Sequence, residues 1–205
     1  MELKTFPLGP LQTNGYILAN DSEAVAIDAG GDPTPMLDYL KEKGLTLKHI
    51  LLTHLHFDHT YGANALAKAT GAPLLCGPDK ELLENWLGKG GDMGLPPVDE
   101  YDATVIEPGE HTFAGFACTV FPTPGHSRGS LTFYFPEAKA AFVGDLIFYR
   151  SVGRTDFPGG DTEVLKQSVR DHIFSLPPET TLYPGHGPAT TAGDEHLHNP
   201  YFQGE

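Results

Sequence analysis

Three histidines and one aspartate lie within six residues of one another, just after a short apolar run. These residues are His54, His56, Asp58 and His59, and the Ile-Leu-Leu run at residues 50–52 predicts a buried strand. In extended backbone the side chains alternate between two sides, so His54 and His56 are predicted to point the same way. Imidazole and carboxylate groups are common ligands of zinc, iron and manganese. The spacing therefore predicts a metal site at the end of this strand, with room for more than one ion.

The same run, His-x-His-x-Asp-His, resembles the metal-binding signature of the metallo-β-lactamase superfamily, and the likeness extends over nearly the whole chain. That superfamily completes its site with a distant histidine, an aspartate and a last histidine, each at the end of a strand. His126, Asp145 and His186 fall in this order here, and each follows a glycine that is itself preceded by an apolar or aromatic stretch. Glycine at that place lets the backbone turn sharply beside a bound ion.

The resemblance implies a centre of two divalent metal ions, zinc in the first instance with iron or manganese as alternatives. In the superfamily arrangement one ion would be held by His54, His56 and His126, the other by Asp58, His59 and His186, and Asp145 would bridge them. Asp58 and Asp145 would be the catalytic carboxylates, with Asp58 orienting the hydroxide that attacks the substrate. The sequence has no Gly-x-Ser-x-Gly elbow, which agrees with hydrolysis that uses no protein nucleophile.

Asp28 follows an apolar run and begins an Asp-Ala-Gly-Gly turn. The superfamily has an Asp-x-Gly turn of this kind next to its metals, so the resemblance implies that Asp28 supports the ligands from behind. The alternative is an aspartate that only shapes the turn.

The predicted elements alternate between groups of strands and helices. Apolar periodicity and flanking glycines predict helices over residues 63–70, 79–87 and 162–174, and the polar tail at residues 194–199 is predicted to fray. This order predicts a mixed α/β (α+β) chain, and its length fits one domain over residues 1–205. The resemblance further implies the αββα sandwich of the metallo-β-lactamase fold.

The charge balance argues against a nucleic-acid partner. The chain has 13 Lys and Arg residues against 27 Asp and Glu residues, a net charge of −14, and no basic cluster, whereas grooves for nucleic acid are usually basic. Neither a membrane span nor a secretory signal is predicted. Cys76 and Cys118 form no C-x-x-C pair and are predicted to be buried, reduced thiols, which favours the cytoplasm. The sequence leaves the oligomeric state open.

Residues 144–160 look like the corresponding loop of glyoxalase II-type hydrolases, in particular their short bacterial branch without the C-terminal helical domain. The resemblance implies a small-molecule thioester substrate, S-lactoylglutathione, which is cleaved to lactate and glutathione. Tyr149, Arg150 and Arg154 could contact a glutathione carboxylate, or Arg154 and Asp156 could simply tie the loop together. Only 19 residues follow His186, so we expect a weaker hold on the substrate than in domain-bearing enzymes.

Two other activities share this fold and are kept as alternatives. A persulfide dioxygenase would use one iron held by the equivalents of His54, His126 and Asp145, and it has a similar Gly-Arg-Thr-Asp-Phe loop. The presence of Asp58, His59 and His186 favours a two-metal hydrolase over it. A lactonase or β-lactamase is less favoured because the loop at residues 150–160 points to thioesters.

Overall fold

The computed structural model describes residues 1–79, 82, 86–91 and 97–203 of the chain. Most of the helix predicted over residues 79–87 lies outside these described residues. Among the described helices, none is long and apolar enough to cross a membrane.

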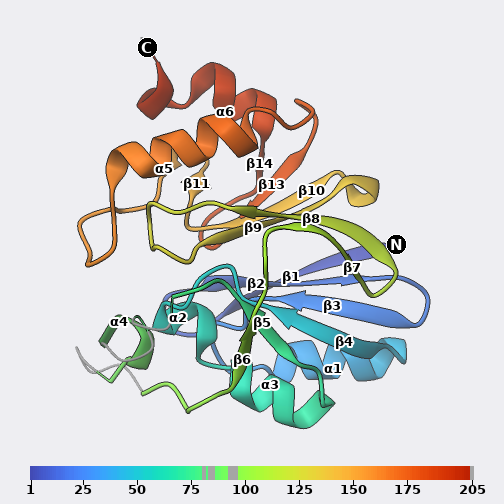
Figure 1. Cartoon of the computed structure of the whole chain (residues 1–205). Coiled ribbons are helices and arrows are strands. Elements are labelled where there is room, and N and C mark those ends of the chain that lie inside the picture. Colours follow the sequence, from blue (N-terminus) through green and yellow to red (C-terminus); the bar gives the residue numbers. More distant parts are fainter. Residues whose placement is uncertain (80–81, 83–85, 92–96, 204–205) are drawn as a thin grey trace. The chain divides into compact units, whose positions relative to one another are not determined.

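The chain forms two compact units, each described here by itself. The first contains Met1–Ile106 and Thr112–Phe116, and the second contains Glu107–His111 and Ala117–Glu205. The described residues form two six-stranded sheets, a two-stranded hairpin and several helices, which are labelled in Figure 1 where there is room. This composition confirms the predicted mixed α/β class.

The sheet of the first unit has its strands in the order in which they occur along the chain. They are β1 (Glu2–Leu8), β2 (Thr13–Ala19), β3 (Glu23–Ile27), β4 (Thr46–Leu51), β5 (Leu74–Cys76) and β6 (Ala103–Val105). The β1–β2 and β2–β3 pairs are antiparallel, whereas the pairs from β3 to β6 are parallel. Every residue of β2 is buried, as expected for a strand that is covered on both faces.

The described residues of the first unit form the helices α1 (Thr34–Lys43), α2 (Phe57–Thr60), α3 (Ala63–Thr70) and α4 (Trp86–Lys89). Figure 1 shows α1 and α3 on the same face of the sheet. The bounds of α3 are those predicted, because Gly71 adopts a left-handed conformation with φ of 75° and closes the helix with a hydrogen bond to the Ala67 carbonyl. Helix α2 carries the second half of the histidine run and begins directly after His56.

The turn between α2 and α3 depends on a glycine. The Gly62 N–H donates to the Ala29 carbonyl at 2.7 Å, and a Cβ built on Gly62 would lie 2.0 Å from the Gly31 carbonyl oxygen.

We expect Gly62→Ala to lower the free energy of unfolding by about 3 kcal/mol in urea denaturation, because the new Cβ would clash with the Gly31 carbonyl and neither backbone segment has room to move. The control is Gly44→Ala, where φ is 66° and no heavy atom lies within 4 Å; its strain should cost about 1–2 kcal/mol. Equal losses in the two variants would contradict this packing argument.

The second sheet is mixed and has the order β14-β13-β10-β9-β8-β7. Its strands are β7 (Gly109–Phe113), β8 (Phe116–Pro122), β9 (Leu131–Phe135), β10 (Ala140–Gly144), β13 (Thr181–Pro184) and β14 (Thr190–Thr191). Strand β10 is parallel to β13 and antiparallel to β9. Strands β11 (Ile147–Phe148) and β12 (Ser151–Val152) form a separate hairpin.

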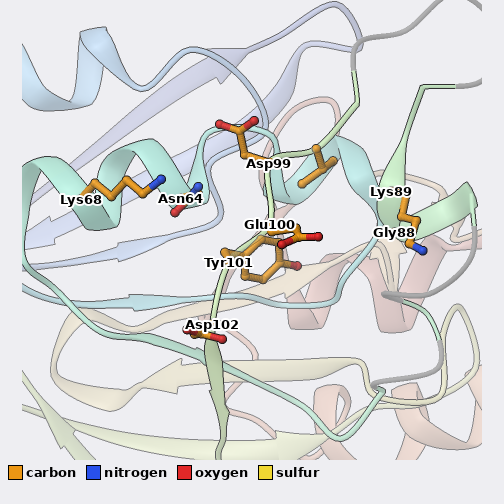
Figure 2. Close-up of a pocket in the computed structure, with 9 residues that line it drawn as sticks. Asn64, Lys68, Gly88, Lys89, Asp99, Glu100, Tyr101 and Asp102 are labelled. Atoms are coloured by element: carbon orange, nitrogen blue, oxygen red, sulfur yellow. The ribbon is translucent and has the colours of Figure 1, made fainter.

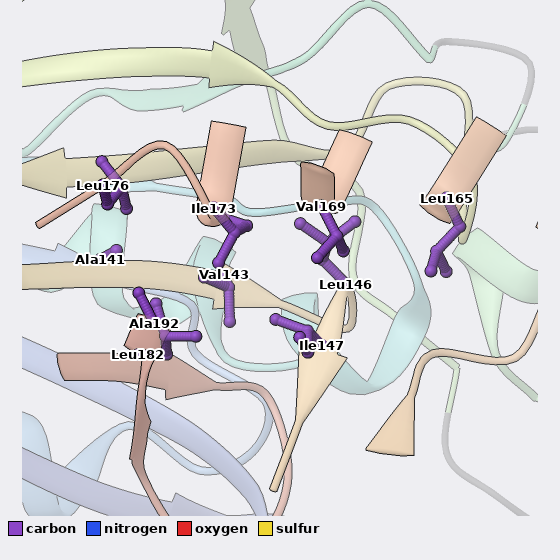
Figure 3. Close-up of a cluster of buried hydrophobic side chains, with 10 residues drawn as sticks. All are labelled: Ala141, Val143, Leu146, Ile147, Leu165, Val169, Ile173, Leu176, Leu182 and Ala192. Carbon is purple, nitrogen blue, oxygen red and sulfur yellow. The ribbon is translucent and has the colours of Figure 1, made fainter. Parts of the chain in front are cut away.

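The core of the second unit lies under its longest helical segment. That segment was predicted as one helix over residues 162–174, but it consists of α5 (Thr162–Ser168) and a π-helical turn (Val169–Ile173), in which the Phe174 N–H donates to the Val169 carbonyl. Figure 3 shows Val169 and Ile173 beside Val143 in a cluster of buried side chains. The π turn keeps both residues fully buried.

The polar tail does not fray, contrary to prediction. Residues 192–198 form helix α6 (Ala192–His198), followed by a 3₁₀ turn (Pro200–Phe202). The Thr191 hydroxyl caps α6 by accepting from the Asp194 N–H. Glu195 within α6 is completely buried, so this end of the chain is tied to the second unit.

Candidate metal centre

The first unit gathers the four residues of the histidine run. Strand β4 ends at Leu51, so the histidines follow the strand rather than continue it. His54, His56, Asp58 and His59 are nevertheless all buried. The ring centroids of His54 and His56 lie 4.7 Å apart, those of His54 and His59 lie 4.1 Å apart, and His59 Nε2 lies 3.8 Å from Asp58 Oδ2. The run therefore forms a compact group of three imidazoles and one carboxylate.

Asp28 and Thr53 form hydrogen bonds to the imidazoles of this group. Asp28 Oδ1 accepts from the Thr53 N–H at 2.8 Å, and Asp28 Oδ2 accepts from the Thr53 hydroxyl at 2.7 Å. His59 Nδ1 lies 2.8 Å from Asp28 Oδ2, and His54 Nδ1 lies 3.1 Å from Thr53 Oγ1. Asp28 has φ of 54°, a left-handed conformation that aspartate tolerates better than most residues.

This network determines which ring nitrogens carry protons. A hydroxyl has one hydrogen, and Thr53 donates its hydrogen to Asp28. His54 Nδ1 must therefore donate to Thr53 Oγ1, and His59 Nδ1 must donate to the Asp28 carboxylate. Both tautomers leave the ligating lone pair on Nε2, as a metal-binding histidine requires. The donor set of the first unit thus fits a divalent metal.

Thr13 is a further supporting residue, which sequence reasoning missed. Its hydroxyl donates to Asp58 Oδ2 at 3.2 Å, and it is completely buried at the start of β2. A Cβ built on Gly30 would lie 2.1 Å from the Asp58 carbonyl oxygen, so the turn after Asp28 packs directly on this residue. Thr13 stands 45 positions from its partner in the sequence, and nothing in the local pattern marks it.

The second unit places Asp145 between two histidines. Asp145 follows β10, His186 follows β13, and His126 lies in the loop after β8. Asp145 Oδ2 is 3.7 Å from His126 Nε2 and 3.6 Å from His186 Nε2. His126 Nδ1 lies 2.7 Å from the Arg154 carbonyl oxygen, so it donates there and leaves the lone pair on Nε2. The three side chains present one shared carboxylate oxygen and two imidazole nitrogens.

The three predicted substrate contacts occupy different environments. Tyr149 is 52% exposed. The Arg150 guanidinium pairs with Asp194 at 2.9 Å and with Glu195 at 2.8 Å. Arg154 forms two 2.7 Å hydrogen bonds to Asp156, and these hold the pKa of that carboxyl at about 2. Both arginines therefore have carboxylate partners within the second unit.

A pocket of about 560 Å³ opens in the first unit (Figure 2). Its lining includes Asn64, Lys68 and Lys89, with the two lysines on either side of residues 99–102 in this view. Three of those four residues are acidic, so the wall carries charges of both signs. Among the described lining residues there is none of the seven predicted ligands. The pocket is thus distinct from the ligand set.

Comparison with known proteins yields matches over the whole chain. The profile of the metallo-β-lactamase superfamily matches residues 8–186. The chain is 34% identical to "Probable metallo-hydrolase YqgX" of Bacillus subtilis, covering 100% of this chain and 99% of the relative. It is also 34% identical to "Hydroxyacylglutathione hydrolase GloC" of Haemophilus influenzae, covering 98% of each.

Two solved structures are similar over the same extent. BLEG-1, described as a B3 metallo-β-lactamase, has a TM-score of 0.92 at 39% identity and covers 99% of this chain and 100% of its own. TTHA1623, described in a di-iron-bound form, has a TM-score of 0.85 at 38% identity and covers 97% and 99%. These likenesses confirm the predicted fold.

Proposed function

Because the chain belongs to the metallo-β-lactamase superfamily, we propose that it is a thioester hydrolase whose seven ligand-type side chains hold two divalent metal ions. A metal-dependent hydrolase is what the superfamily profile and the YqgX relative indicate. The observation that supports the finer assignment is the 34% identity to GloC, a hydroxyacylglutathione hydrolase, over nearly the full length of both chains. The proposed reaction converts S-lactoylglutathione and water to lactate and glutathione.

The proposed ligands are those of the superfamily arrangement, with His54, His56 and His126 on one ion, Asp58, His59 and His186 on the other, and Asp145 on both. The Nδ1–H groups of His54, His59 and His126 all have acceptors, which supports this set because their Nε2 atoms are left to ligate. We propose zinc, and the di-iron-bound TTHA1623 supports two ions while keeping iron, beside manganese, as an alternative.

Bound divalent ions would supply Lewis acidity at such a site. We propose that Asp58 accepts a hydrogen bond from the attacking water, and the Thr13 hydroxyl, which donates to its carboxylate, would help to orient it. Asp28 fixes the imidazole of His59. For the substrate we propose Tyr149 as the first contact because it is exposed; Arg150 and Arg154 already have carboxylate partners and would add only long-range positive charge.

We also propose that the protein works in the cytoplasm. Cys76 and Cys118 are both buried, and within the described residues neither belongs to a disulfide. Burial raises the pKa of the Cys118 thiol and keeps it protonated. Buried thiols of this kind suit a reducing compartment.

The deciding assay is hydrolysis of S-lactoylglutathione by the purified protein, with metal content measured on the same sample. We expect turnover on the order of 1–1,000 per second, about two metals per chain, and loss of activity after chelation that zinc restores. A sample that holds one iron and consumes oxygen with a persulfide substrate would instead identify a dioxygenase.

A second candidate is β-lactam hydrolysis, which the likeness to BLEG-1 favours. A chromogenic cephalosporin assayed on the same metal-loaded sample separates the two activities. Cephalosporin turnover without thioester turnover would overturn the proposed substrate class and leave the proposed metal centre intact.

A further inference from the structure

Glu195 is a completely buried carboxylate in helix α6 and lies outside the predicted ligand set. It accepts four hydrogen bonds, from Arg150 N at 2.9 Å, Arg150 Nη1 at 2.8 Å, Thr190 Oγ1 at 2.6 Å and Asn199 Nδ2 at 2.9 Å. Burying a carboxylate is costly unless it is paired and hydrogen-bonded. All four hydrogen-bonding groups are donors, and two of them belong to Arg150, in the turn between β11 and β12.

Helix α6 and its C-cap residue Asn199 therefore bind this turn at two consecutive residues, Arg150 and Ser151. Arg150 is bound through both its backbone N–H and its guanidinium. Its φ of 57° is a left-handed conformation that non-glycine residues adopt only when their surroundings fix it. Asn199 Nδ2 donates in addition to the Ser151 carbonyl at 3.0 Å. Glu195 and Asn199 together fix the path of the chain between β11 and β12.

The turn is directly continuous with the ligands of the second unit. Asp145 lies two residues before β11. Gly153, which follows β12, donates to the Leu146 carbonyl at 3.2 Å, and a Cβ built on it would lie 1.8 Å from the Asp145 carbonyl oxygen. The next carbonyl, that of Arg154, accepts from His126 Nδ1. A shift of the hairpin would therefore move both Asp145 and the acceptor that orients His126.

We propose that Glu195 is a positioning residue, which fixes residues 145–154 through Arg150. The fixed segment in turn holds Asp145 and His126 in the orientation that binds metal. This inference rests on the proposed metal centre and is independent of the substrate. It gives the Arg150 guanidinium a role within the protein, as the partner of Glu195.

The test is Glu195→Gln, which removes the charge and turns one acceptor oxygen into an amide donor that faces other donors. We expect zinc to dissociate about 10- to 100-fold faster from the variant in a chromogenic chelator assay. We expect kcat to fall with KM within about twofold, because no substrate contact is lost. In the metal-free protein, the amides of Ser151 and Gly153 should exchange hydrogen faster.

The matched control is Asp194→Asn, which removes the other carboxylate partner of Arg150. The Asp194 side chain is 41% exposed, and exposed pairs of this kind contribute little, so zinc release from Asp194→Asn should stay near wild type.

A folded Glu195→Gln protein with wild-type zinc release and wild-type amide exchange would overturn the proposal. If that variant does not fold, Asn199→Ala decides, since it removes the bonds to Ser151 and Glu195 while the Glu195 carboxylate keeps its charge and its other three hydrogen bonds; unchanged zinc release there would also overturn the proposal. Zinc release is measured without substrate, so a failed thioester assay does not affect this test.

Discussion

Asp145→Ala is expected to give a folded protein that has lost most of its metal and at least about 1,000-fold in kcat, since a metal contributes several kcal/mol to the transition state. Asp145 Oδ2 lies within 3.7 Å of His126 Nε2 and 3.6 Å of His186 Nε2. Its removal leaves two imidazoles without the carboxylate that we propose binds both ions, and divalent ions bind such a pair weakly.

The measurement is metal content after gel filtration, together with thioester turnover in excess zinc. Asp171→Ala is the control, because that aspartate is exposed on the π-helical turn and bonds only to Gln167 among the interactions described. We expect the control to retain metal and activity. A fully active Asp145→Ala protein would reject the assignment of the ligands, whatever substrate the enzyme uses.

The ligand run could be predicted from sequence because its signal is local. His54, His56, Asp58 and His59 follow one strand within six residues, so their proximity needs no knowledge of tertiary structure. Helix α3 was predicted with its bounds for a similar reason, since Gly71 marks its end.

Asp28 was expected as a supporting residue only through the family resemblance, and Thr13 and Glu195 could not be predicted, because their roles depend on partners distant in sequence. In the sequence, Glu195 is one residue of a polar tail. Its role follows only from its contact with Arg150, 45 positions earlier. The break of the helix after Ser168 likewise follows from packing of Val169 and Ile173 on the core rather than from propensity. A buried charge is the clearest case, because burial and pairing must be known together.

Asp28→Asn is expected to weaken zinc binding by about 10- to 100-fold and to lower the free energy of unfolding by about 1–3 kcal/mol. The aspartate accepts three hydrogen bonds, from Thr53 N, Thr53 Oγ1 and His59 Nδ1. Asparagine offers one acceptor oxygen and places two donors at the other position. Its side chain has the same shape, and it tolerates the φ of 54° at this position, so the variant changes hydrogen bonding while the backbone stays as it is.

The physical reason lies in the tautomer of His59. If the new amide faces His59, Nδ1 can only accept, and the ring proton moves to Nε2, the nitrogen that we propose ligates the metal. Nitrogen NMR of the metal-free protein reports this change directly, without reference to activity. Thr53→Val removes the hydroxyl that accepts from His54 Nδ1 and donates to Asp28 Oδ2. It should change the tautomer of His54 and leave that of His59 as it is, because the Asp28 carboxylate still accepts from His59 Nδ1. Thr53→Ser should behave like wild type. Zinc affinity that stays unchanged in Asp28→Asn would show that the aspartate only shapes its turn, and the imidazoles would then be oriented by packing alone.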